Sequence, residues 1–193
     1  KLKVCKVIKL IFILCEKIIN MLIVLFGLPA TGKNYIGDIL SKEYSFFYYD
    51  ADDDLTREIK KIINQERIMP NDLRTEYFNK IIKNVKQCQK KHLNLAVSQA
   101  FVKEEHRELF LKNFPEAIFL LVDAKKLIRN KRLDNRKHLI KRNYAKKIED
   151  IFERPLIKHF IIDNSNGKSE IKNQLNIIIN NKKYAEKNRK SFG

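Results

Sequence analysis

Short apolar segments alternate with longer amphipathic segments from Met21 to about residue 180. The short segments are rich in β-branched or aromatic residues and end at polar residues or turn signals, which is typical of strands. They are MLIVLF (21–26), FFYYD (46–50), LNLAVS (93–98), AIFLLVD (117–123) and HFIID (159–163). The segments between them have helical spacing and cover residues 35–43, 55–64, 72–91, 104–113, 125–135, 144–152 and 169–180. Strands that alternate with helices predict an α/β fold with a parallel sheet.

The two ends of the chain differ from this pattern. Residues 1–20 place apolar side chains on one helical stripe and lysines opposite, which predicts an amphipathic helix. Charges interrupt it well short of the ~20 apolar residues of a membrane span, and no small-residue cleavage site follows. We expect either a non-functional extension upstream of a start at Met21, or a helix for packing or for a membrane surface. The basic residues 183–193 form a tail that we expect to fray, which leaves residues 21–182 as the folded domain.

Composition limits the architecture and the compartment. A chain of 193 residues with 44% apolar composition is near the usual size of one domain. The three cysteines, Cys5, Cys15 and Cys88, are odd in number and form no C-x-x-C pair. This pattern favours neither a disulfide framework nor a zinc site, so we expect a reducing cytoplasm.

The formal charge of +17 raises two interpretations. It would attract phosphate-rich partners, which makes nucleic acid a candidate. The lysines, however, are spread along the chain and form no single dense block. We therefore favour a solvated surface that attracts ATP over a nucleic-acid footprint. The sequence does not define an oligomeric state.

The segment GLPATGKN, residues 27–34, has the spacing G-x-x-x-x-G-K of a phosphate-binding (Walker A) loop. It follows an apolar strand and precedes a helix, which is the context that this motif requires. The alternative interpretation of this segment is an ordinary glycine-containing turn between a strand and a helix. The glycines allow backbone N–H groups to converge on a phosphate, and the lysine adds a cation. The predicted nucleotide-binding residues are Gly27, Leu28, Pro29, Ala30, Thr31, Gly32, Lys33 and Asn34.

Asn34 occupies the position after the lysine, where a magnesium-binding hydroxyl is expected. Its amide oxygen is an acceptable hard ligand, although it projects further than a serine oxygen. We expect a competent site with altered metal geometry. The alternative is that Asn34 caps the helix or faces solvent.

Four aspartates follow the second predicted strand: Asp50, Asp52, Asp53 and Asp54. Open parallel sheets bind ligands at this end of their strands. A carboxylate here could accept the proton of an attacking hydroxyl, and could hold magnesium through water. For Asp52 we favour this functional interpretation, whereas for Asp53 and Asp54 we favour helix capping.

The phosphate loop followed by DAD (50–52) resembles the gluconate kinase branch of the small-molecule kinases related to shikimate and nucleoside monophosphate kinases. Three further segments are similar: MPNDLRTEYF (69–78), LAVSQAFVKEEHRELF (95–110) and KRLDNRKHLIKRNYAKKIEDIFERP (131–155). The resemblance covers roughly residues 21–179. It implies a three-layer α/β/α P-loop NTPase fold with a five-stranded parallel sheet and a mobile lid.

The same resemblance implies roles for basic residues. Arg74, Lys103 and Arg107 would bind the acceptor, together with Asp50 and Asp52. Arg132 and Arg136 would come from the lid, and their spacing of four places them on one side of a helix. There they would cover the nucleotide and offset the charge of the transferring phosphoryl group.

The sequence departs from the gluconate kinase pattern on the acceptor side. Leu55, Thr56 and Arg57 replace the expected histidine and proline, and the run 65–67 (QER) replaces an expected glycine. The nucleotide side is intact. ATP binding is therefore the firmer expectation, and gluconate as acceptor the weaker one.

We predict an ATP- and Mg²⁺-dependent kinase that phosphorylates a hydroxyl of a small polar, anionic acceptor such as a sugar acid. Lys33, Asp52 and Arg132 are its predicted catalytic residues, and Asn34 and Asp52 are its predicted metal ligands. Two alternatives stay open: an enzyme that acts on a polynucleotide 5′-hydroxyl, and a regulatory ATP-binding module that transfers no phosphate.

Overall fold

The computed structural model describes residues 20–135 and 140–191. Its centre is one sheet of five strands, all parallel, in the order β2-β3-β1-β4-β5. The strands are β1 (Met21–Phe26), β2 (Phe47–Asp50), β3 (Asn94–Ser98), β4 (Ile118–Asp123) and β5 (Phe160–Asp163). All five predicted strands are confirmed, each to within one residue of its predicted start.

The central position of β1 in the sheet explains why its sequence is continuously apolar. It pairs with β3 on one side and with β4 on the other, so that Ile23 lies beside both Ala96 and Ile118. Every residue of β1 is buried. A parallel sheet covered on both faces requires such a strand, because neither face of it meets water.

Helices cover both faces of the sheet. Their bounds are α2 (Lys33–Tyr44), α3 (Arg57–Asn64), α4 (Asn71–Gln89), α5 (Glu104–Asn113), α6 (Lys126–Asp134), α7 (Arg142–Ile151) and α8 (Lys168–Ser191), with a 3₁₀ turn η1 (Ala51–Asp54) after β2. Alternate residues of β1 join different cores. Val24 packs with α3, α4, α5 and α7, whereas Ile23 packs with α2 and α8. The three-layer α/β/α fold predicted from the sequence is therefore confirmed.

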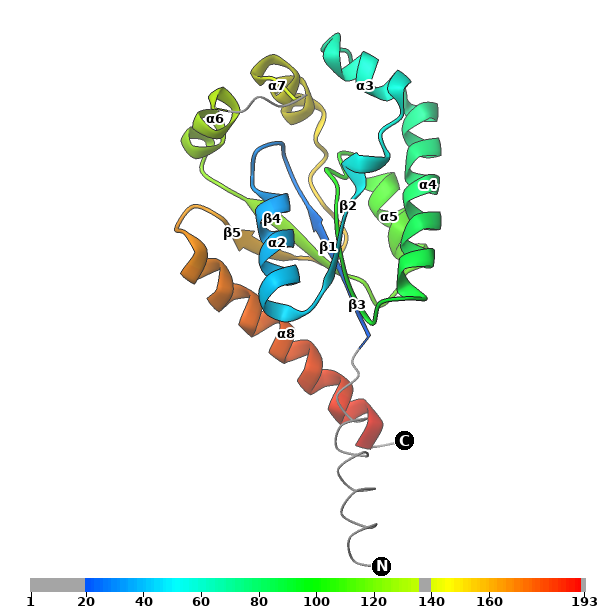
Figure 1. Ribbon diagram of the computed structural model, residues 1–193, viewed down its shortest axis with the longest axis vertical. Helices are drawn as coiled ribbons and strands as arrows, with labels where there is room; N and C mark the ends of the chain where they lie inside the picture. Colours follow the sequence, from blue (N-terminus) through cyan, green and yellow to red (C-terminus); the bar gives the residue numbers. More distant parts are fainter. Residues whose placement is uncertain (1–19, 136–139, 192–193) are drawn as a thin grey trace, which may run out of the picture.

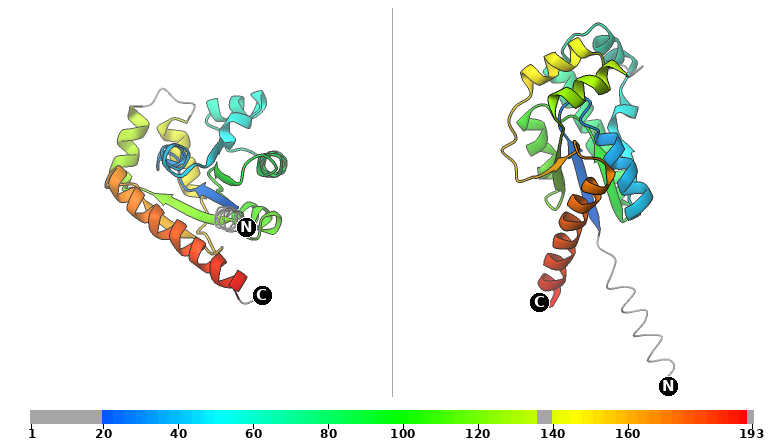
Figure 2. Two further views of the ribbon diagram at one scale, coloured as in Figure 1. Left: turned by 60° about the horizontal axis from the view of Figure 1, so that its bottom comes forward. Right: turned by 90° about the vertical axis from the view of Figure 1, so that its left-hand side faces the viewer.

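The last helix differs from its prediction. We expected it to end at residue 180 and the tail of residues 183–193 to fray, but α8 continues to Ser191. No glycine or proline interrupts this stretch, so the chain carries no signal that ends a helix. The predicted boundary between residues 182 and 183 consequently falls inside α8. Figure 2 shows α8 running away from α6 and α7, past the end of the sheet where the strands begin.

The carboxyl ends of the strands meet at one edge of the sheet. The loop between β1 and α2 lies there, and α3, α6 and α7 stand above it (Figure 1). Open parallel sheets place ligands at this edge. Among the described helices, none combines the length and the apolar character needed to cross a bilayer.

Candidate active site

The loop between β1 and α2 adopts backbone angles that favour glycine. Gly27 and Gly32 have φ of 131° and 95°, and Ala30 between them has φ of 63°. A side chain at position 27 would bring its Cβ within 2.5 Å of the Val122 carbonyl oxygen, and one at position 32 would collide with the Asn164 amide. Both glycines of the motif are thus required by conformation and by space.

Lys33 lies over the loop that precedes it. Its Nζ donates to the carbonyl oxygens of Gly27 at 2.9 Å and Leu28 at 3.0 Å. The hydroxyl of Thr31 also donates to the Leu28 oxygen, at 3.0 Å. The cation is therefore held at the mouth of the loop, beside the N-terminal end of α2, where a bound phosphate would meet both positive groups.

Arg132 of α6 reaches the same loop. Its guanidinium donates to the carbonyl oxygens of Thr31 at 3.0 Å and Asn164 at 3.0 Å. Asn164 in turn donates from its side-chain amide to Thr31 O at 2.8 Å. The structure thus brings Arg132 to the predicted nucleotide side. Arg136, the other predicted lid contact, lies outside the described residues.

Asn164 is a site residue that sequence reasoning missed. It directly follows β5 and is 2% exposed. The only available signal was its position, because polar residues at the carboxyl end of a parallel strand face the ligand edge of the sheet.

Asp50, the last residue of β2, is the hub of a small polar network. Its Oδ2 accepts a hydrogen bond from the Asn34 amide, and its Oδ1 accepts from Ser98 Oγ at 3.2 Å and from the Asp52 backbone N–H at 3.1 Å. Burial, followed by the negative charge of Asp52, raises the pKa of Asp50 above its ordinary value. The structure therefore pairs Asn34 with Asp50, whereas we had predicted that Asn34 and Asp52 share a metal.

Replacing Asp50 by Asn is expected to stabilise the fold at neutral pH. The folded carboxyl holds its proton more tightly than the unfolded one, so stability falls as pH rises from the ordinary pKa of 3.8 through the raised value. Asn cannot ionise and avoids this loss. Melting temperatures at about pH 8 and about pH 4 should show an advantage for Asp50→Asn that shrinks on acidification. An advantage that grows towards low pH would contradict the assignment.

Asp52 begins a second network that includes two side chains absent from our predictions. Gln99 Nε2 donates to Asp52 Oδ1 at 3.0 Å and to the Tyr77 hydroxyl at 2.9 Å. That hydroxyl donates to the Ala51 carbonyl at 2.5 Å. The Asp52 carboxylate is thereby oriented from the protein side and faces a cavity.

The predicted capping role of Asp53 and Asp54 is wrong. Helix α3 is capped by Thr56, whose Oγ1 accepts from the Ile59 N–H at 3.2 Å. Asp54 instead accepts from Tyr49 and Asn84 and lies 3.2 Å from Lys80 Nζ. Asp53 is exposed and lines the cavity. The chain makes its 3₁₀ turn before α3 starts, so the cap falls later than the sequence suggested.

A cavity of about 270 Å³ opens between the phosphate loop, η1, α3, α4 and α7. Its charged lining residues are Lys33, Asp50, Asp52, Asp53, Lys60 and Arg74. The lysine of the phosphate loop and the candidate base therefore line the same cavity. Its size suits a small molecule rather than a polymer.

Arg74 is the unusual member of this lining. It is only 5% exposed, and its NH2 group donates to the Met69 carbonyl at 3.0 Å. Within the described chain, its Nε and NH1 atoms have no hydrogen-bond partner. Burial lowers the pKa of Arg74 from its ordinary value. Buried donors without partners are costly, so the geometry favours an anionic ligand at this point.

Tyr144 of α7 lies beside Arg74. Burial raises the pKa of its phenol, the Arg74 charge lowers it, and Asp52 raises it further. The Tyr144 hydroxyl therefore interacts electrostatically with both Arg74 and Asp52. Sequence reasoning placed Tyr144 at the start of a helix and gave it no role, because nothing in its local sequence indicates that it turns towards the cavity.

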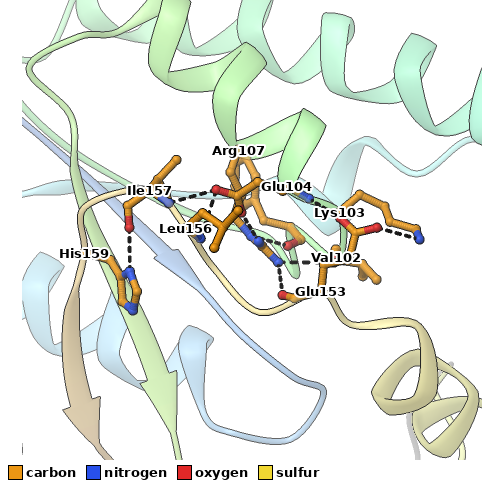
Figure 3. Close-up of polar contacts among 9 residues, drawn as sticks. Val102, Lys103, Glu104, Arg107, Glu153, Leu156, Ile157 and His159 are labelled. Carbon is orange, nitrogen blue, oxygen red and sulfur yellow. Dashed lines mark hydrogen bonds and ion pairs between the residues drawn. The ribbon is translucent and has the colours of Figure 1, made fainter.

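Two predicted acceptor ligands, Lys103 and Arg107, lie elsewhere. Arg107 is fully buried and donates to the carbonyl oxygens of Phe101 (2.9 Å), Val102 (3.2 Å) and Glu153 (2.6 Å), and to the Glu104 carboxylate (Figure 3). Lys103 pairs with Glu153 at 2.9 Å. Neither residue lines the cavity.

The contacts of Arg107 show what it does instead. Its guanidinium packs between the rings of Phe26 and Phe152, 5.7 and 5.1 Å from their centroids. Through Glu153 and Glu104, Arg107 connects the segment after α7 to the start of α5. These contacts indicate a structural role. Of the three basic residues predicted to bind the acceptor, Arg74 alone lines the cavity.

The sequence profile of the shikimate kinase family matches residues 29–180. The chain belongs to the shikimate kinase family. This membership makes it an ATP-dependent P-loop kinase of the small-molecule branch, as the phosphate loop and the DAD segment predicted. Comparison with curated proteins gives no match.

Solved structures of this kinase branch share the fold at low sequence identity. A sugar kinase from a Janibacter species has a TM-score of 0.70 and 14% identity, with 81% of this chain and 92% of that chain covered. A gluconokinase from Sinorhizobium meliloti has a TM-score of 0.68 and 16% identity, with 79% of this chain and 87% of that chain covered. A shikimate kinase from Acinetobacter baumannii in complex with shikimate has a TM-score of 0.58 and 18% identity, with 86% of this chain and 98% of that chain covered. At these identities the structures support the fold and leave the acceptor open.

Proposed function

We propose that this kinase transfers the γ-phosphate of ATP to a hydroxyl of a small acid, the class that includes sugar acids. The observation that carries the proposal is Arg74, a buried guanidinium with two unpartnered nitrogens in the same cavity as Lys33 and Asp52. A carboxylate would supply the acceptors that these nitrogens lack. The kinases of similar fold include a gluconokinase and an enzyme solved with shikimate, both consistent with an acidic acceptor.

The nucleotide side would hold ATP through the loop. Backbone N–H groups of residues 27–34 and the start of α2 would surround the β-phosphate, and Lys33 would move from its carbonyl contacts to the phosphates. Arg132 is already at the loop, where its charge would offset that of the transferring group. ATP is a cytoplasmic cosubstrate, which fits the cytoplasmic location that we propose.

Asp52 would act as the general base. Gln99 orients its Oδ1, and the carboxylate lines the cavity that would hold the acceptor hydroxyl. The hydroxyl oxygen attacks the γ-phosphorus, the bond from that phosphorus to the β-bridging oxygen breaks, and ADP leaves. The hydroxyl proton passes to Asp52, so charge and atoms balance.

Magnesium fits the oxygen atoms at the start of α2. The Asn34 side-chain amide donates to the Asp50 carboxylate there, so its oxygen remains available to an ion, and Asp52 is close enough to raise the pKa of Asp50. Within the described residues, no cluster of three or more His, Cys, Asp or Glu side chains forms a dedicated metal site. Magnesium in kinases commonly keeps several waters and binds one or two protein oxygens plus phosphates, which matches this set. When bound, the ion would neutralise charge on the β- and γ-phosphates.

Replacing Asn34 by Ala should raise the magnesium concentration needed for half-maximal turnover by about 10-fold or more, because it removes a metal-supporting group. Replacing it by Ser should preserve or improve activity, because serine offers a shorter oxygen ligand. Turnover is measured in a magnesium titration at fixed ATP. Identical titration curves for the wild type and Asn34→Ala would remove Asn34 from the metal site.

The proposal is tested by ADP release with sugar acids, shikimate, nucleosides and oligonucleotides, for wild type and Arg74→Met. We expect acids to be used, and the Arg74→Met variant to raise their KM by about 10-fold or more, since it removes a charge-assisted contact. Use of oligonucleotides with strong salt dependence would point to a polynucleotide kinase. ATP binding with no turnover of any acceptor would point to a regulatory module.

A further inference from the structure

The lining of the acceptor cavity combines charged groups with apolar side chains. The carboxylates and Lys33 would serve phosphoryl transfer, and Arg74, which acts on Tyr144, would bind the anion. The walls include Ile63, Met69, Phe78, Phe101, Val102 and Ile148, each at most 8% exposed. These side chains come from α3, α4, α7 and the segments that precede α4 and α5, so several elements contribute to the apolar surface.

Two polar side chains of these walls, Tyr77 and Gln99, already make hydrogen bonds within the protein. The Tyr77 hydroxyl donates to Ala51 O and accepts from Gln99, and the Gln99 side chain also contacts Asp52 and the Ala100 N–H. Lys60 and Asp53 line the cavity but are exposed to solvent, so they belong to its rim. Apart from the carboxylates, Lys33, Arg74 and Tyr144, a ligand inside the cavity would meet mostly hydrocarbon.

We infer that the preferred acceptor is a hydroxy acid with a hydrocarbon body, not a polyhydroxylated sugar acid. This inference rests on the proposed function and specifies its substrate class. A hydroxyl placed against these walls would lose its water without gaining a hydrogen-bond partner, and each such loss disfavours binding. An acid with one reactive hydroxyl for Asp52, a carboxylate for Arg74 and unsubstituted carbon between them would match the candidate base, the buried guanidinium and the apolar walls.

The test compares 6-hydroxyhexanoate with gluconate as acceptors for the full-length chain. Both are six-carbon acids with a terminal hydroxyl, and gluconate adds four hydroxyls along the body. A hydrophobic pocket rejects one added hydroxyl by about 10²-fold, so kcat/KM should favour 6-hydroxyhexanoate by about 10²-fold or more. Val102→Thr, which is nearly isosteric and adds a hydrogen-bonding group to the wall, should reduce this preference by about 10-fold.

The control variant is Ile63→Val, which changes the volume of the wall but not its polarity, and it should leave the preference within about 3-fold. Melting temperatures confirm that both variants fold. Gluconate used as well as 6-hydroxyhexanoate, or better, would overturn the inference while supporting the proposed function. Phosphorylation of neither acid would also overturn the inference, whereas the proposed function falls only if no acid of the wider panel is phosphorylated.

Discussion

Replacing Asp52 by Asn is expected to lower kcat by roughly 10²-fold or more while ATP affinity changes little. The substitution keeps an oxygen that can accept the Gln99 hydrogen bond, so the local network survives. It removes the ability to accept the proton of the attacking hydroxyl. Initial rates of ADP release and the binding of a fluorescent ATP analogue measure the two effects separately.

The matched control is Asp53→Asn. Asp53 lies next to Asp52 in η1, has the same charge and lines the same cavity, but it is exposed. It should retain turnover within about 3-fold, because a solvated carboxylate at the rim adds little beyond general attraction. Equal losses in the two variants would show that net charge, rather than proton transfer at Asp52, limits the reaction.

Replacing Arg107 by Met should destabilise the fold by about 3–5 kcal/mol, which is the usual cost of removing one partner from a buried ion pair. The change removes one hydrogen-bond donor from the Glu104 carboxylate and from each of three carbonyl oxygens. Chemical denaturation measures the loss. Lys103→Met, which breaks a more exposed pair with Glu153, should cost less than about 1 kcal/mol.

The Arg107→Met variant also distinguishes a structural role of Arg107 from a role in acceptor binding. A structural role predicts a lower free energy of unfolding and an acceptor KM close to that of the wild type at temperatures where the variant is folded. A stable Arg107→Met variant with a greatly raised acceptor KM would return Arg107 to the residues that bind the acceptor.

Arg107 also shows that a sequence pattern does not determine the direction of a side chain. Its position after β3 and its charge fit an acceptor ligand, but they do not reveal which way the guanidinium turns. The side chain points into the protein because carbonyl oxygens of residues 101, 102 and 153 converge on it, and residue 153 is distant in the sequence. Arg74 carried the same kind of signal and does reach the cavity.

The strands and the phosphate loop were predictable because their signals are local. A continuous apolar run predicts a buried parallel strand, and the loop requires glycines at fixed spacing. Gln99, Tyr144 and Asn164 were not predictable in this way, because their residue types are common and their roles arise from tertiary contacts. Only the position of Gln99 and Asn164 just after strands pointed towards the site.

The central claim is that the γ-phosphate of ATP becomes bonded to a hydroxyl of a small acid held by Arg74 and Asp52. The most direct measurement is ³¹P NMR of the full-length chain with ATP, Mg²⁺ and a mixture of hydroxy acids. We predict a new phosphate monoester resonance that grows with the ADP signals in the wild type and is nearly lost in Asp52→Asn. Consumption of ATP that yields only inorganic phosphate, or a monoester that forms equally fast in Asp52→Asn, would contradict the account.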